Sequence, residues 1–571
     1  MRKLLRTNGA WLRAIRTGMS LACLTCCIGQ VKDSGDHPRD SALDTPPDTG
    51  PCEDAIYIGD LAEGFADFCD GYCSREVSGN LYIGDVSQEE LAGLHCLTRV
   101  GGNLEFDANH LTHLGGLEAL ESVGGDLTIA GYWLTDLSTM VSLRFIGGNF
   151  FILRTGLREL GELRSLTTVG GFIYIMENPL LSQISGLNTI TSPIMGVALS
   201  ENGQSPELSG MNGVPVILGG MALWTGGVSH ISGLNSVTFI GGNINLGTFD
   251  TNDVSSLKTI TGLQSLRTMM GNFDLERGHL DTITGMQNLT YLGGSISFKE
   301  FVGLTDISGL SSLEVVGGYV QIYGMYMEDL HGFDSLKYAG GGILITHNSN
   351  LKRISAFGSL TKVGDGFFIS SNDVLTDVSG LSISGEVDGD VYIAWNNTLT
   401  NLHGLEGITR MNGDLNIDKN PALTDIAALG NVRTIDGDLR ITENQALEDL
   451  NGLDSLQSIG GNLWCTDNGS LQDFSGLDRL DFIGEELIIE DNPSLQSLAG
   501  LESVRSVGAS LEIRTNIGLQ DVLSLSNVQT VGGDFIVSRN DLLPSANAEA
   551  LLEAIGPENI QGQIYVGDNA P

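Results

Sequence analysis

Residues 413–436 read GDLNIDKNPALTDIAALGNVRTID, and residues 437–460 read GDLRITENQALEDLNGLDSLQSIG. The two stretches agree in residue type, with the same apolar positions, the same Asn and the same Gly-Asp start. A unit of 23 or 24 residues recurs in this form from about residue 79 to residue 566 of the 571-residue chain. A fixed period of this length predicts a solenoid with one structural unit per repeat.

The repeats are aligned by the first apolar residue of the Leu-x-Ile pair, called the anchor. Nearly every interval between anchors is 23 or 24 residues, and two are 29. The anchors are Leu81, Leu104, Leu127, Phe150, Ile173, Val197, Met221, Ile244, Phe273, Ile296, Val320, Ile343, Phe367, Val391, Leu415, Leu439, Leu463, Leu487, Leu511, Phe535 and Ile564.

The apolar spacing changes within each unit. Leu415 and Ile417 are two apart, as in a short strand with one buried face. From Leu423 to Ile435 the apolar residues fall at every third position, which fits neither an α-helix nor a long strand. Short extended segments joined by corners would give this spacing. We therefore predict an all-β, right-handed parallel β-helix of about 20 coils, with a leucine-rich-repeat horseshoe as the alternative.

An Asn stands five residues after many of the anchors. An inward Asn at a corner can satisfy backbone groups that no strand partner reaches, and stacked amides can bond to each other. We predict a structural ladder rather than a ligand site. The column comprises Asn109, Asn178 and Asn202 and then, without a break, Asn348, Asn372, Asn396, Asn420, Asn444, Asn468, Asn492, Asn516 and Asn540. Paired glycines such as Gly460-Gly461 end many coils, where they allow positive φ or a tight corner.

The repeated motif resembles one family. Gly-Asn/Asp-Leu-x-Ile-x-x-Asn, as in residues 413–420 and 437–444, followed by Leu-x-x-Leu-x-Gly-Leu, as in residues 447–453, is similar to the repeats of bacterial leucine-rich surface proteins and lipoproteins related to the receptor L-domain. The resemblance covers residues from about 79 to 566. It implies a β-helix at the cell surface and does not indicate a ligand.

The N-terminus indicates export. Five basic residues precede a short apolar run from Met19 to Ile28, which is typical of a signal segment over residues 1–29. Leu24-Thr25-Cys26-Cys27 resembles a bacterial lipobox imperfectly, so we expect lipidation at Cys27, with Cys23 or simple cleavage as alternatives. Residues 30–51 are polar, acidic and Pro-rich, as in a disordered tether. The expected location is the cell surface, as an outer-membrane lipoprotein, or the medium as a secreted protein.

Both ends of the repeat region carry features typical of caps. Cys52, Cys69, Cys73 and Cys96 predict two disulfides in an N-terminal cap and first coil over residues 52–100, because an exported chain of this kind oxidises its thiols. Three pairings are open, and zinc is the alternative, although the spacing fits no common zinc site. Solenoid repeats fill residues 101–543, and a helix in residues 544–571 forms the C-terminal cap. Cys465 stands alone in an inward column and is predicted to be a buried thiol.

The charge excludes one class of partner. The formal net charge is −41, and residues 51–571 hold 65 of the 70 acidic groups but 22 of the 29 basic ones. Such a chain repels nucleic acid. Ten positions after the anchor stands a row of carboxylates, Asp306, Asp377, Asp425, Asp449, Asp473 and Asp521. We expect this row to cap corners, with weak Ca²⁺ binding between coils as the alternative.

The sequence offers aromatic side chains rather than catalytic motifs. Neither a His-Glu-x-x-His zinc motif, a Gly-x-Ser-x-Gly elbow nor a Walker loop is present. We expect no enzymatic activity and no cofactor, with a carbohydrate-active β-helix enzyme as the rival. The expected ligand-binding residues, with plain packing as the equal alternative, are Phe151, Tyr174, Trp224, Phe368, Tyr392, Trp395 and Trp464.

The sequence therefore predicts a non-catalytic recognition or adhesion protein. It would bind a glycan or a protein through one face of its sheet, near the irregular Met-rich repeats of residues 191–330. We expect a monomer that reaches the membrane only through a lipid anchor. A structural envelope spacer is a further alternative.

Overall fold

The computed structural model describes residues 52–107, 110–160, 163–203, 206–224, 227–247 and 257–571. Cys52–Pro571 forms one compact unit. The predicted export signal, the Cys27 lipidation site and the tether lie outside the described residues, as do Asn109 and most of the insertion after Gly247.

One long parallel sheet carries the anchors. Each of its strands pairs with the strand of the next coil, and anchor faces anchor throughout, as in Leu415 against Leu439. The strands within the described residues are β3 (Leu81–Ile83), β5 (Leu104–Asp107), β7 (Leu127–Gly131), β9 (Phe150–Thr155), β11 (Phe172–Met176), β12 (Gly196–Ser200), β15 (Met221–Leu223), β18 (Ile244–Gly247), β21 (Phe273–Gly278), β24 (Ile296–Phe301), β26 (Tyr319–Tyr323), β29 (Gly342–Thr346), β32 (Gly366–Ser370), β34 (Asp390–Ala394), β36 (Leu415–Asp418), β38 (Leu439–Thr442), β40 (Leu463–Thr466), β42 (Leu487–Glu490), β44 (Leu511–Arg514), β46 (Phe535–Ser538) and β47 (Ile564–Gly567).

Short strands form a second parallel face. One ladder contains β1 (Glu53–Tyr57), β2 (Tyr72–Val77), β4 (Leu97–Val100), β6 (Ser122–Val123), β8 (Phe145–Ile146) and β10 (Thr168–Val169). The next contains β14 (Val216–Ile217), β17 (Phe239–Ile240), β20 (Thr268–Met269), β23 (Tyr291–Leu292), β25 (Val315–Val316), β28 (Tyr338–Ala339), β31 (Lys362–Val363), β33 (Ser384–Val387), β35 (Gly407–Met411), β37 (Thr434–Ile435), β39 (Ser458–Ile459), β41 (Phe482–Ile483), β43 (Ser506–Val507) and β45 (Thr530–Val531).

Two smaller sheets lie at the carboxylate row. One is the four-stranded sheet of β13 (Glu207–Leu208), β16 (His230–Ile231), β19 (Thr259–Ile260) and β22 (Thr282–Ile283), and the other is the pair β27 (Asp329–Leu330) and β30 (Arg353–Ile354). The described helical segments are α2 (Gln88–Ala92), α3 (Ser545–Ile555) and the single turns η2 (Ser308–Leu310), η3 (Ser379–Leu381), η4 (Ala427–Leu429), η5 (Leu523–Asn527) and η6 (Pro557–Asn559).

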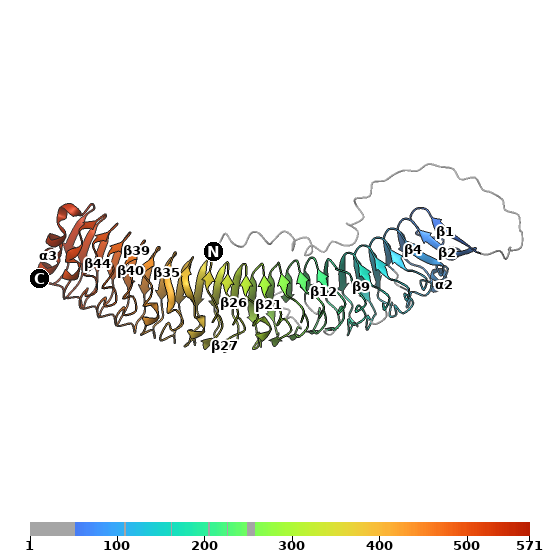
Figure 1. The fold of residues 1–571 in the computed structure, drawn as a ribbon, viewed down its shortest axis with the longest axis horizontal. Coiled ribbons are helices and arrows are strands. Elements are labelled where there is room, and N and C mark those ends of the chain that lie inside the picture. The colour runs from blue at the N-terminus through green and yellow to red at the C-terminus, as the bar shows by residue number, and fades with distance from the viewer. Residues whose placement is uncertain (1–51, 108–109, 161–162, 204–205, 225–226, 248–256) are drawn as a thin grey trace, which may run out of the picture. The chain divides into compact units, whose positions relative to one another are not determined.

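The predicted all-β parallel solenoid of about 20 coils is confirmed. In Figure 1 the strands β9, β12, β21, β26 and β44 follow one another in chain order along the stack. Short strands and single turns, rather than long helices, connect the strands of the long sheet. The apolar residues at every third position therefore belong to short segments joined by corners, as predicted.

The core fills the interior of every coil. In the coil that begins at Gly413, every predicted inward side chain from Leu415 to Ile435 is at most 1 % exposed. The Cys465 thiol, two coils further on, is also buried in the core, and burial raises its pKa to about 12. This thiol is therefore protonated and unreactive at neutral pH.

The Asn ladder is present and has a direction. The Asn420 N–H donates to Oδ1 of Asn444 over 3.1 Å, and the Asn420 side-chain amide donates to the Ile393 carbonyl over 2.9 Å. The same pattern runs from Asn348 to Asn540, and all nine side chains are 0 % exposed. It ends on Asn569, whose Oδ1 accepts from the Asn540 N–H over 3.0 Å. Asn178 and Asn202 form a separate short rung.

A left-handed residue precedes each Asn. Four positions after the anchor, φ lies between 51° and 61° in fifteen coils, and none of these residues is glycine. This conformation turns the chain inward, so that the next side chain, the Asn, points into the core. The residues are Arg154, Glu177, Glu201, Arg277, Glu300, His347, Ser371, Trp395, Lys419, Glu443, Asp467, Asp491, Thr515, Arg539 and Asp568.

A second ladder, not predicted, lies just before many of the long strands. The Asp438 N–H donates to Oδ1 of Asp414 over 2.8 Å, and the Asn462 N–H donates in the same way to Asp438. In the Gly460-Gly461 pair, a Cβ on Gly460 would lie 2.2 Å from the Asp436 carbonyl oxygen and a Cβ on Gly461 would lie 2.3 Å from Oδ1 of Asp438. The paired glycines therefore serve close approach between coils. Of the two predicted roles, positive φ or a tight corner, positive φ is wrong for Gly460 and Gly461.

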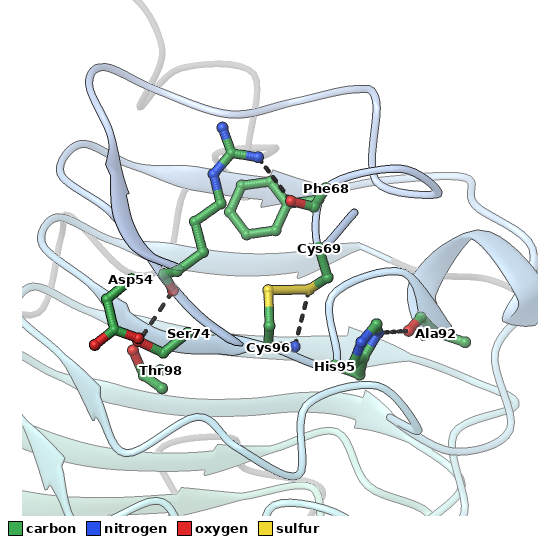
Figure 2. Close-up of a disulfide and its surroundings, with 9 residues drawn as sticks. Asp54, Phe68, Cys69, Ser74, Ala92, His95, Cys96 and Thr98 are labelled. Atoms are coloured by element: carbon green, nitrogen blue, oxygen red, sulfur yellow. Dashed lines mark hydrogen bonds between the residues drawn. A yellow bond between two sulfur atoms is a disulfide. The ribbon is translucent and has the colours of Figure 1, made fainter. Parts of the chain in front are cut away.

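The N-terminal cap holds both predicted disulfides. Of the three possible pairings, the structure has Cys52–Cys73 and Cys69–Cys96. Figure 2 shows the second bond, with the Cys96 N–H donating to Sγ of Cys69. Arg75 donates to the Phe68 carbonyl over 2.6 Å and lies over the Phe68 ring at 4.4 Å. At the other end, α3 packs against η5 and β47, so the predicted helical cap is confirmed.

Candidate functional site

The outward residues of the long sheet form the candidate site. In each strand the anchor and the second residue after it point inward, so the residue between them faces out. In five consecutive strands these outward residues are Phe368, Tyr392, Asn416, Arg440 and Trp464, each in register with the next. These five residues and Trp395 are called the aromatic row.

The predicted ligand-binding residues Phe151 and Tyr174 lie beside each other, and both are half-buried. Phe151 and Tyr174 stack with ring centroids 4.7 Å apart at 5°, and Phe172 lies 5.7 Å from Tyr174. Burial raises the pKa of the Tyr174 hydroxyl. Because these rings cover one another, the geometry favours packing over binding at this pair. Trp224 is also half-buried.

Trp464 already holds a cation. The Arg440 guanidinium lies 3.7 Å from its ring centroid, and Arg440 also forms an ion pair with Asp438 at 2.9 Å. The Trp464 and Arg440 side chains are both half-buried. This arrangement leaves one indole face occupied and fixes the Arg440 side chain in the sheet surface.

Trp395 differs from the other predicted residues because it is exposed. It is 42 % exposed, whereas Phe368 and Tyr392 are half-buried. Its ring lies 6.0 Å from Tyr392, which in turn lies 6.1 Å from Phe368. The Lys419 ammonium lies 5.0 Å from the Trp395 ring and pairs with Glu443 at 3.0 Å.

The backbone places Trp395 at this position. Val391 and Ile393 point into the core, and the left-handed turn at Trp395, with φ of 54°, sends Asn396 inward. Every other residue of that left-handed column is charged or polar. A bulky aromatic residue in this conformation is uncommon and costs stability. Its side chain projects where its neighbours carry Ser371 and Lys419.

Other exposed aromatic residues were missed. Tyr132 and Trp133 are 59 % and 66 % exposed, and Tyr326 is 51 % exposed. They follow β7 and β26 at the corner where other coils carry Asn or a turn residue. The replacement of Asn by Tyr132 five residues after Leu127 was the available signal.

The carboxylate row caps corners, as one of the two alternatives predicted. Asp425 accepts from the Ala427 N–H over 2.7 Å, and Asp449 accepts from the Asn451 N–H over 3.0 Å. Asp306, Asp377, Asp473 and Asp521 accept in the same way from the residue two positions on. Within the described residues no group of three or more His, Cys, Asp or Glu side chains is arranged to hold a metal ion. Calcium bridging stays an untested alternative.

One cleft near the N-terminal cap contains titratable groups. It has a volume of about 290 Å³ and is lined by Gln88, His95, His113 and Glu118 among others. The Nδ1 atom of His113 accepts from the Gly115 N–H over 3.0 Å, and the Glu118 carboxylate accepts from the Gly116 N–H. These hydrogen bonds hold the turn together, which is a structural role for both side chains.

No helix among the described residues has the length and apolar character that a membrane span needs.

Comparison with known proteins adds little to these observations. No protein-family model matches the sequence, and no curated protein matches it. Among solved structures, the chain is similar to an internalin, InlF of Listeria monocytogenes, at 17 % identity over 74 % of this chain and 88 % of that one, with a TM-score of 0.25. A leucine-rich-repeat protein of Leptospira interrogans matches at 13 % identity over 85 % and 93 %, with a TM-score of 0.23. At these scores neither likeness adds to what the strand pairing shows.

Proposed function

We propose that this protein is an exported, non-catalytic recognition or adhesion protein that binds a protein partner through the aromatic row. The observation that carries the proposal is Trp395, an exposed aromatic side chain at a left-handed position where the fourteen other residues of the column are charged or polar. Exposure of a large aromatic ring beside Tyr392 and Phe368 costs free energy and is typical of a binding surface. Lipid anchoring at Cys27 and display at the cell surface belong to the same proposal.

The composition of the aromatic row favours a protein partner. Tyr, Trp and Arg are the residue types that dominate binding hot spots, and the row contains all three within five adjacent strands. Strands in a sheet lie about 4.8 Å apart, so the row spans roughly 19 Å. That length suits the core of a standard protein interface. A glycan that stacks on Trp395 is the alternative ligand.

Cell binding tests the proposal and separates the two ligands. Fluorescently labelled protein is titrated onto cells that were untreated, protease-treated or periodate-treated. We expect saturable binding that protease abolishes and periodate leaves intact. Loss on periodate treatment alone would identify a glycan instead.

The matched variants locate the contact. Trp395→Ala should weaken binding about tenfold or more, as expected of a hot-spot residue. Tyr326→Ala removes an equally exposed aromatic residue from a different column and should leave binding unchanged. Equal binding by both variants would refute the assignment of the aromatic row.

A further inference from the structure

The second sheet carries an uncharged surface in its middle. Six adjacent strands, β14, β17, β20, β23, β25 and β28, present outward residues that are paired in register. These residues are Val216, Phe239, Thr268, Tyr291, Val315 and Tyr338. The same column carries Lys362 in the next coil and Arg410 further along. The column is also uncharged from β37 to β45, where it carries Thr434, Ser458, Phe482, Ser506 and Thr530, so the middle run is distinguished by its large apolar and aromatic side chains rather than by its lack of charge.

Large apolar side chains extend this surface. Leu218 and Met270 are 52 % and 49 % exposed, in a column where many coils have glycine, such as Gly241 and Gly293. The Phe239 ring reaches over Gly241, to 3.3 Å from where a Cβ would stand. Tyr291 and Met195 are each 38 % exposed. Together with the six residues above, Met195, Leu218 and Met270 make up what is called the apolar patch.

The charges beside the apolar patch are self-complementary. Arg267, Thr290 and Glu314 occupy one column in three successive coils. The Thr290 backbone N–H donates to the Arg267 carbonyl over 3.0 Å, and the Glu314 backbone N–H donates to the Thr290 carbonyl over 2.9 Å. Arg267 and Glu314 are exposed and stand one coil on either side of Tyr291. Glu314 also forms an ion pair with Lys337 of the next coil at 2.9 Å. A twofold axis along β23 would place Arg267 of each copy opposite Glu314 of the other.

We propose that the apolar patch is the interface of a homodimer, formed by face-to-face packing of two copies about β23. Six strands at about 4.8 Å and the four residues from the Arg267 column to the Met270 column at about 3.3 Å give roughly 380 Å² per copy, or about 760 Å² in total. This area is below that of a standard interface, so the dimer is weak and transient and forms at micromolar or higher concentrations. Elsewhere the acidic surfaces of two copies repel each other. The proposal does not depend on the proposed function and replaces the expectation of a monomer.

Sedimentation velocity of the purified protein from about 1 to 100 μM tests this proposal. We expect a reversible monomer–dimer equilibrium, with a dissociation constant raised at least tenfold by Met270→Asp. Val141→Asp places the same charge at a 54 % exposed apolar position outside the apolar patch and should leave the constant unchanged. A monomer at every concentration would overturn the proposal, as would a dimer insensitive to Met270→Asp.

A charge swap tests the geometry independently. Arg267→Glu and Glu314→Arg should each weaken the dimer, because each places like charges opposite one another across the twofold axis. The double variant should restore the wild-type constant, which a merely structural role of either residue would not do. If both single variants weaken the dimer and the double variant is weaker still, the packing about β23 is wrong. Circular dichroism of each variant checks that the fold is retained.

Discussion

Removal of one amide from the Asn ladder should destabilise the solenoid measurably. In Asn420→Ala, the Asn396 N–H loses an acceptor at 3.1 Å and the Ile393 carbonyl loses a donor at 2.9 Å. The Asn396 N–H is left unpaired in the buried interior, whereas the Ile393 carbonyl belongs to the β34–β36 ladder and loses only a second donor. We therefore expect the free energy of unfolding to fall by about 1–3 kcal/mol, the cost of one unpaired buried group.

Urea unfolding followed by circular dichroism measures this loss. Asn397→Ala is the matched control, because Asn397 is an exposed neighbour whose amide bonds only Asp373, at 2.8 Å. We expect less than about 0.5 kcal/mol for the control. Since solenoids can unfold in parts, amide exchange provides a local measurement, and exchange at Asn396 should accelerate in Asn420→Ala. Equal stability of the two variants, with unchanged exchange at Asn396, would refute the role assigned to the ladder.

Three further substitutions test other features of the coil. Gly437→Ala should cost about 1–3 kcal/mol in urea unfolding, because its Cβ would lie 2.2 Å from Asp414, whereas Gly358→Ala, with no atom within 4 Å, should be neutral. Thr515→Gly should raise stability by about 0.5 kcal/mol, since a β-branched residue at φ 56° is strained; a loss would contradict this. Burial raises the pKa of Asp274 to about 6, so the folded state favours the protonated carboxyl and loses stability as pH rises from about 4 to above 6. Asp274→Asn should therefore raise the urea midpoint at pH 8 but not at pH 4, and a pH-independent effect would exclude this cause.

The repeat register could be predicted from the sequence because it rests on buried apolar residues. Leu415 and Ile417 recur with a constant spacing, and a slip of one residue would expose the core. The Asn column was visible for the same reason, since one residue type fills it from Asn348 to Asn540. Asn569 lies five residues after the anchor Ile564 and could have been found by extending the same rule.

Other features depend on neighbours that a sequence does not display. The second ladder was missed because Asn, Asp and Ser share its column and resemble an ordinary polar surface. The left-handed column has no common residue type at all, as Thr515 and Trp395 show. Exposure of the aromatic residues depends on what lies beside them: Arg440 covers Trp464 at 3.7 Å, whereas Lys419 lies 5.0 Å from the Trp395 ring and leaves that side chain 42 % exposed. The disulfide pairing required the fold of the cap.

The Asn ladder also makes the length of this molecule adjustable. From Asn348 to Asn540 each rung presents the same donor and acceptor to the rung 24 residues away. Excision of one such period would bring Asn396 against Asn444 with the same hydrogen bonds and leave both caps intact. Each coil removed or duplicated changes the reach of the solenoid by about 4.8 Å. Selection could therefore lengthen or shorten the solenoid in equal steps, without redesigning the ends.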